Sequence, residues 1–100
     1  VLGILQDKDA AGIIEALAGL GARFHVTQSQ SERALDVDDL AELVVSMVGQ
    51  GATNSFASLE EAVADAREWA SETDRRAVLI TGSVTLVGEA IALAARDGWK

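Results

Sequence analysis

Three residues of this chain carry side chains suited to binding an anion: Lys8, Arg33 and Ser83. Each stands within a few residues of the end of a short apolar run, Arg33 in a polar loop and Ser83 in a Gly-Ser turn. A lysine ammonium group attracts a carboxylate as a point charge, and an arginine guanidinium group can hold it through two parallel hydrogen bonds. A hydroxyl at the start of a helix adds a donor beside the positive end of the helix dipole. Together these residue types favour a site for an anion, particularly the carboxylate of an amino acid.

Four neighbouring residues can support such a site: Asp7, Asp9, Thr81 and Gly82. Either aspartate can cap the helix that we expect to begin near residue 10. A metal site at this Asp-x-Asp pair is the other interpretation, but two carboxylates alone are a weak signal, so capping is favoured. Gly82 follows Thr81 where the chain must turn, and glycine adopts backbone conformations that other residues resist.

Each candidate ligand also has a purely structural interpretation. Lys8 can be a solvated loop cation, and Arg33 can pair with Glu32 or Asp36 nearby in the chain. Ser83 can cap the last helix, a role compatible with ligand binding because its hydroxyl and its amide both face the end of the preceding run. These alternatives stay open on the sequence alone.

Short apolar runs alternate with amphipathic stretches along the chain. The runs predict strands, and the stretches with apolar residues at helical spacing predict helices. The expected strands are 1–5, 23–28, 52–56 and 77–81, and the expected helices are about 10–20, 36–48, 58–70 and 85–96. This alternation predicts an α/β fold: one three-layer, Rossmann-like domain over 1–100, with a mainly parallel sheet of about four strands and helices on both faces.

The order of these elements brings the candidate residues together. The carboxyl ends of parallel strands lie at one edge of a sheet, and ligands bind in the crevice beyond that edge. The loops 6–9, 28–34 and 81–85 all lie there, and they contain the three candidate ligands. We therefore expect two cations and a hydroxyl to face one crevice.

Other notable residues are assigned to packing. His25, the only histidine, lies in the middle of a predicted strand and away from the loop edge, which favours a structural role over a catalytic one. Met47 falls in the apolar stripe of the second helix, so we expect it in the core. Gly88 lies inside the last helix, where glycine costs about 1 kcal/mol relative to alanine, and close packing of the helix on the sheet would offset that cost. The spacing from Gly82 to Gly88 matches no phosphate-binding fingerprint.

Composition narrows the class of protein. The chain has 100 residues, 49% of them hydrophobic, which suffices for the core of about one domain. Its formal net charge of −8 argues against nucleic acid or an anionic membrane as a partner. It has no Cys, which is compatible with a reducing cytoplasm, and no apolar run approaches the roughly 18 residues of a membrane span. Because the chain opens on an apolar run without Met, we expect a piece of a longer protein.

Three segments together resemble a known family. They are GILQDKD at 3–9, the stretch 27–36 with its Arg33, and TGSVTLVGE at 81–89. The combination of G-x-x-x-DKD with TGS-x-x-x-VGE, in this order and spacing, is similar to the C-terminal domain of folylpolyglutamate synthase. That enzyme is often bifunctional with dihydrofolate synthase and belongs to the Mur ligase superfamily. The resemblance covers essentially the whole chain.

The resemblance implies an ATP-dependent ligase that adds L-glutamate to a folate or to dihydropteroate through an acyl phosphate. In such enzymes the C-terminal domain closes over a preceding ATPase domain and holds the incoming amino acid. Lys8 and Ser83 match positions that contact the amino acid in related ligases, and Arg33 lies in the loop where they place a recognition arginine. ATP and Mg would be bound mainly by the preceding domains, and so would the folate.

The resemblance also implies that 1–100 is a truncated domain of a cytoplasmic enzyme, able to fold but inactive alone. The alternative, from another class of protein, is a non-catalytic α/β module that binds or senses a small anion. A sheet that lacks a strand in such a fragment would have an open edge that favours self-association.

Overall fold

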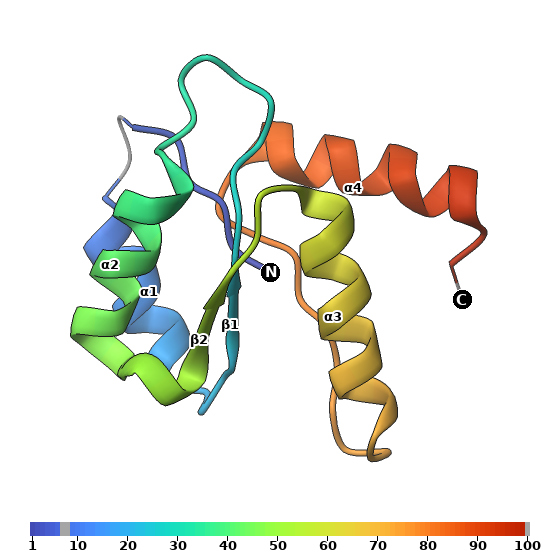
Figure 1. Ribbon diagram of the computed structural model, residues 1–100, viewed down its shortest axis with the longest axis horizontal. Coiled ribbons are helices and arrows are strands. Elements are labelled where there is room, and N and C mark those ends of the chain that lie inside the picture. Colours follow the sequence, from blue (N-terminus) through green and yellow to red (C-terminus); the bar gives the residue numbers. More distant parts are fainter. Residues whose placement is uncertain (7–8, 100) are drawn as a thin grey trace.

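The computed structural model describes residues 1–6 and 9–99, which form alternating helices and strands around a small parallel sheet (Figure 1). The elements are α1 (Ala10–Ala18), β1 (Phe24–Val26), α2 (Val37–Val48), a 3-10 turn (Gln50–Ala52), β2 (Thr53–Ser55), α3 (Leu59–Ser71) and α4 (Val84–Asp97). The four predicted helices are therefore confirmed, and α/β is the correct class.

The sheet is smaller than predicted. Among the residues that the structure describes, only β1 and β2 are regular strands, paired in parallel with Phe24 opposite Thr53. The runs 1–5 and 77–81 lie alongside as extended segments, joined by isolated parallel bridges from Leu2 to Val26 and from Leu2 to Thr81. A sheet of four strands is thus not confirmed. The bridges involve single residue pairs, too few for a continuous ladder of hydrogen bonds.

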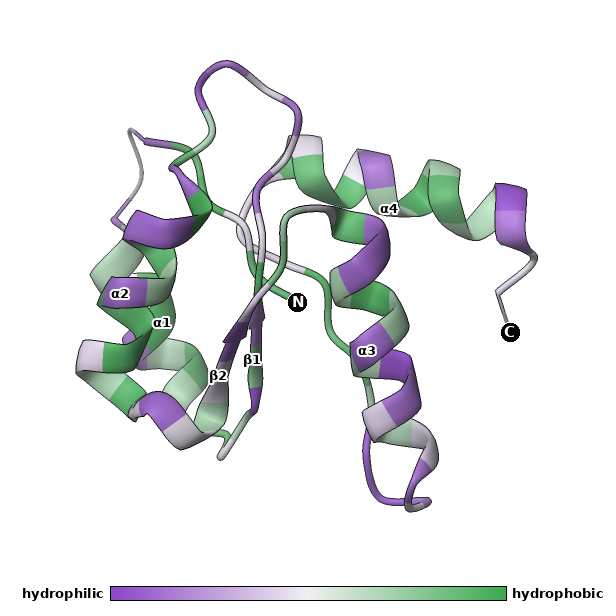
Figure 2. Cartoon of the chain, viewed as in Figure 1, coloured by the Kyte–Doolittle hydropathy of each residue, from purple (hydrophilic) through white to green (hydrophobic). Residues whose placement is uncertain are grey.

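Helices cover both faces of the strands, as the predicted three-layer arrangement requires. Figure 1 shows α1 and α2 on one side of the strands and α3 and α4 on the other. The α1 and α2 side encloses the larger apolar cluster, whose buried members are Leu2, Ile4, Ile14, Phe24, Val26, Leu40 and Val44. The other side encloses a smaller cluster of Leu59, Val63, Leu86 and Ala90. In Figure 2 purple and green segments alternate along α2 and α3, whereas α4 is green over most of its length.

Local capping explains where the helices begin. Each helix follows a residue whose side-chain oxygen accepts a backbone N–H from the first turn: Asp9, Asp36, Ser58 and Ser83. Such a bond satisfies one of the donors that the start of a helix leaves without an intrahelical partner. The last helix ends at Gly98, which adopts the left-handed conformation with φ of 65°.

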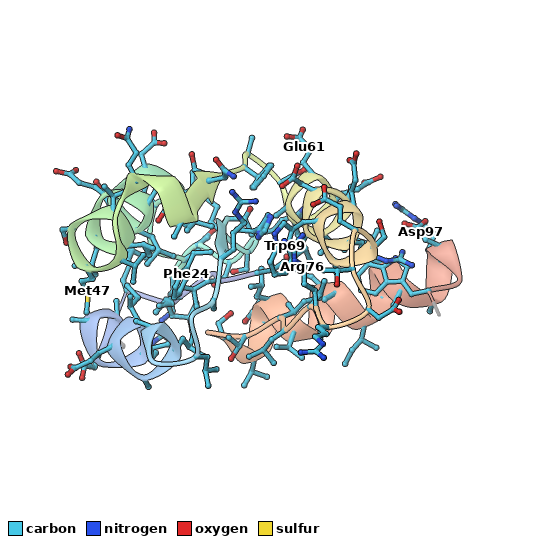
Figure 3. The ribbon with its side chains drawn as sticks, turned by 90° about the horizontal axis from the view of Figure 1, so that it is seen from below. Phe24, Met47, Glu61, Trp69, Arg76 and Asp97 are labelled. Carbon is cyan, nitrogen blue, oxygen red and sulfur yellow. The ribbon has the colours of Figure 1, made fainter. Side chains whose placement is uncertain are left out.

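Two packing predictions are wrong. Met47 is 38% exposed, and Figure 3 places its side chain at the outer edge of the α1 and α2 layer. Gly88 does not mediate close packing, because a Cβ atom built there meets no atom within 4 Å. It lies on the outer side of α4, near the exposed Val84 and Ile91. Helical spacing identifies which face of a helix is apolar. The α4 helix is apolar on two faces, and only one of them packs against the rest of the fold.

Candidate functional site

The carboxyl ends of the extended segments meet at the top of Figure 1, as predicted. Segment 1–6 lies between the Arg33 loop on one side and segment 77–81 on the other. The amide of Gln6 donates to the carbonyl of Arg33 at 2.8 Å, and the amide of Leu35 donates to the carbonyl of Ile4 at 2.8 Å. On its other side, the amide of Gly3 donates to the carbonyl of Thr81 at 3.3 Å. Backbone hydrogen bonds therefore bring the end of segment 1–6, the Arg33 loop and the end of segment 77–81 to one edge.

Arg33 lies in the exposed loop that links β1 to α2. The loop is held by its own polar groups: the hydroxyl of Ser31 accepts the amide of Arg33 at 3.1 Å, and the amide of Ala34 donates to the carbonyl of Ser31 at 3.1 Å. At its base, the side-chain oxygen of Gln28 accepts the amide of Val37 at 2.8 Å. Local turns thus give the backbone around Arg33 a defined shape.

Ser83 begins α4, and its hydroxyl accepts the amide of Leu86 at 2.9 Å. The capping role is therefore present in the structure, while ligand binding by the same residue stays a prediction. Gly82 has φ of 109°, and a Cβ atom there would overlap the carbonyl oxygen of Gly3 and lie 2.9 Å from a methyl of Leu2. Glycine is required here both by its conformation and by the close approach of two backbones. Thr81, the other supporting residue, is half-buried.

Among the acidic candidates, Asp9 caps α1 by accepting the amide of Gly12 at 3.1 Å. Lys8 and Asp7 lie outside the described residues, so their predicted roles stay predictions. Across 1–6 and 9–99, no group of three or more His, Cys, Asp or Glu side chains gathers to hold a metal ion. We therefore assign no magnesium ligand to this part of the chain.

One residue of this edge, Glu89, ends the TGSVTLVGE segment, but its type and spacing predicted no role for it. Glu89 on α4 accepts the backbone amide of Gln30 at 3.0 Å, and thereby joins two residues 59 positions apart. Glu89 is the only charged residue between Val84 and Ala95. A single carboxylate on an otherwise apolar helix was the available signal, but nothing in the sequence indicated its partner.

A cleft of about 470 Å³ lies beside this edge. It is lined by the Arg33 loop at 28–30, by the start of α3 at 57–60 and by the face of α4 that carries Glu89 and Arg96. Arg96 pairs with Glu60 across the cleft at 3.2 Å. A separate cavity of about 430 Å³ lies at the opposite ends of the strands, where Leu20, Arg23 and Leu79 contribute to its lining.

His25 lies away from the candidate site and is part of the packing between β1 and α3. Its side chain is 2% exposed, stacks on Phe56 with ring centroids 5.8 Å apart, and places Nε2 2.9 Å from a carboxylate oxygen of Asp65. Burial lowers the pKa of His25 below its usual 6.5, and the hydrogen bond to Asp65 partly opposes that shift. These contacts agree with the predicted structural role.

Two tryptophans pack at the margins of the fold. The guanidinium carbon of Arg76 lies 4.5 Å from the ring centroid of Trp69, and that of Arg67 lies 5.3 Å from the ring centroid of Trp99. Figure 3 shows Trp69 and Arg76 next to each other beside α3.

In the part of the chain that the structure describes, no helix has the length and apolar character needed to cross a membrane.

Comparison with known proteins identifies relatives of this chain, although no protein-family profile matches it. It is 33% identical to a dihydrofolate synthase/folylpolyglutamate synthase of Mycobacterium tuberculosis over 108 residues, which covers 97% of this chain and 22% of that protein. Among solved structures, it is similar to Mycobacterium tuberculosis folylpolyglutamate synthase complexed with ADP and AMPPCP, with a TM-score of 0.87 and 33% identity. A second structure of that synthase, complexed with ADP, has a TM-score of 0.87 and 32% identity.

Sequence and structure agree on this relationship. Each solved structure covers 92% of this chain, whereas the chain covers 22% of each of those proteins. The chain is thus homologous to a C-terminal region of the mycobacterial synthase. The resemblance inferred from the segments 3–9, 27–36 and 81–89 is confirmed.

Proposed function

We propose that this chain supplies the glutamate-binding groups, and part of the ATP site, of a cytoplasmic ATP-dependent ligase that adds L-glutamate to a folate or to dihydropteroate. The observation that carries the proposal is the meeting of the Arg33 loop, the end of segment 1–6 and the Ser83 turn at one edge. The homology to a folylpolyglutamate synthase supports the choice of glutamate over other anions.

In the proposed reaction, the γ-phosphoryl group of ATP passes to a carboxylate of the folate or of dihydropteroate, which gives an acyl phosphate and ADP. The amine of L-glutamate attacks the acyl carbon, the bond to the phosphate breaks, and the amine loses a proton as the amide forms. Lys8, Arg33 and Ser83 would bind the carboxylates of the glutamate, because carboxylates buried without partners are costly. ATP, Mg and the folate would be held mainly by a preceding ATPase domain, and the chain would be inactive by itself.

The binding half of the proposal is tested by titrating the purified chain with L-glutamate and following backbone amide signals by NMR. We expect shifts at 30–35 and 81–86, and weaker binding of L-glutamine, which lacks the second carboxylate. Arg33→Ala should weaken binding by about tenfold or more, the effect of losing a charge-assisted contact. Arg23→Ala is the matched control, because Arg23 is an exposed arginine at the opposite ends of the strands.

Two results would contradict the proposal. Equal affinity for glutamate and glutamine, with shifts outside this edge, would refute the site and favour a module for another small anion. Turnover of ATP by the chain alone, in the presence of folate and glutamate, would refute its dependence on another domain.

A further inference from the structure

Glu89 is the one charged residue in an otherwise uncharged stretch of α4, from Val84 to Ala95. It is half-buried on α4, between apolar neighbours, and its Oε2 atom lies 3.0 Å from the amide nitrogen of Gln30. The amide of Gln30 gives this carboxylate a specific hydrogen-bond donor. Its partner belongs to the loop that carries Arg33, whereas Glu89 itself belongs to the helix that begins at Ser83.

The hydrogen bond therefore connects the two halves of the proposed site. Glu89 is six residues beyond Ser83, about 9 Å along the axis of α4, so the two residues are parts of one rigid helix. Gln30 is three residues before Arg33. The Arg33 loop stands above the ends of the strands with the first turns of α4 beside it (Figure 1).

Within the loop, short-range hydrogen bonds join the residues on either side of Gln30 and continue to Arg33. The amide of Ser31 donates to the hydroxyl of Ser29 at 3.4 Å, and the amide of Arg33 donates to the hydroxyl of Ser31 at 3.1 Å. Ser29 is 4% exposed, so this chain of turns begins at a buried residue. A displacement at Gln30 would therefore displace Arg33, because the intervening backbone has a defined local shape.

We propose that Glu89 is a positioning residue: by holding the amide of Gln30, it fixes the Arg33 loop relative to the Ser83 turn and so sets the affinity of this edge for a dicarboxylic amino acid. The inference rests on the proposed function for its ligand. A dicarboxylate that contacts both halves binds best when their separation is fixed in advance, since less ordering is then required on binding. Glu89 acts through the loop and does not touch the amino acid.

Two substitutions of Glu89 can distinguish a positioning role from an effect of its charge on ligand binding. A carboxylate near an anion site repels the ligand, so a purely electrostatic role predicts tighter binding whenever the charge is removed. Glu89→Gln removes the charge and keeps an oxygen that can accept the amide of Gln30. Glu89→Ala removes both. Positioning predicts that only the alanine variant weakens binding.

The test combines hydrogen exchange at the Gln30 amide with L-glutamate titration, both followed by NMR on the whole chain. For Glu89→Ala we expect exchange at Gln30 to be about tenfold faster and the Kd for L-glutamate to rise about five- to tenfold, the effect of losing one solvent-exposed hydrogen bond of ordinary strength. Glu89→Gln should keep both values within about twofold of wild type. Glu15→Ala, an exposed glutamate on α1, is the control and should change neither.

Unchanged exchange at Gln30 in Glu89→Ala would overturn the proposal, and so would tighter glutamate binding in both Glu89 variants. If the wild-type chain bound no glutamate, the proposed function would fail. The exchange measurement would still decide whether Glu89 holds the loop. Far-UV circular dichroism of each variant identifies any loss of fold, and the glutamine variant keeps the test valid if the alanine variant does not fold.

Discussion

Replacing Gly82 by alanine should destabilise the fold strongly, because two separate costs coincide at this position. The φ of 109° is strained for any residue with a side chain, at about 1–3 kcal/mol. The new methyl group would also overlap the carbonyl oxygen of Gly3 and crowd Leu2, and overpacking of this kind costs about 1–3 kcal/mol. We expect the free energy of unfolding to fall by about 3 kcal/mol or more, a large part of the roughly 5–15 kcal/mol typical of a domain.

The assay is urea unfolding followed by far-UV circular dichroism, with the slope of the transition compared between variants. Gly88→Ala is the matched control, since a methyl group there meets nothing within 4 Å. It should raise the free energy of unfolding by about 0.5–1 kcal/mol through helix propensity alone. A Gly82→Ala variant within about 0.5 kcal/mol of wild type, the range of an ordinary surface substitution, would refute the argument that two backbones meet at this turn.

Two further predictions concern the packing on either side of the sheet. Burial lowers the pKa of His25 below 6.5, so protonation of this residue favours the unfolded chain. The free energy of unfolding should therefore be highest above about pH 6.5 and fall as the pH drops through that value. It should level off below the lowered pKa of the folded state. His25→Gln should flatten this part of the pH profile, measured by urea unfolding at each pH, and an unchanged profile would contradict a buried neutral imidazole. Leu40→Ala should lower the free energy of unfolding by about 2–5 kcal/mol because Leu40 is fully buried. Met47→Ala should lower it by about 0.5 kcal/mol or less, because Met47 is exposed. Equal losses of stability in thermal unfolding would disprove the exposed position of Met47.

Helix positions were predictable because they depend on contacts close in sequence. Asp9, Asp36, Ser58 and Ser83 each cap a helix by accepting an amide two or three residues ahead. The apolar spacing of each helix extends only a few turns. The parallel alignment of the extended segments followed from the alternation of elements, since a helical crossover returns the chain in the same direction.

The extent of the sheet was less predictable. The runs 1–5 and 77–81 have the composition of strands, yet they contribute only isolated bridges. Regular pairing requires a neighbour with a matching register over several residues. A run of apolar residues indicates that a segment is extended and buried, but its hydrogen bonds depend on segments far away in the chain.

The sequence by itself determined the alternation of elements, the helix starts and the edge shared by the Arg33 loop and the Ser83 turn, because these follow from local spacing and from the direction of the chain. Only the tertiary structure decided which side of α4 is covered, and hence that Gly88 is exposed rather than packed. It alone also decided that Gly82 lies against Gly3 and that Glu89 holds Gln30. Those contacts join residues about 60 to 80 positions apart, where one backbone or side chain meets another through folding and not through spacing.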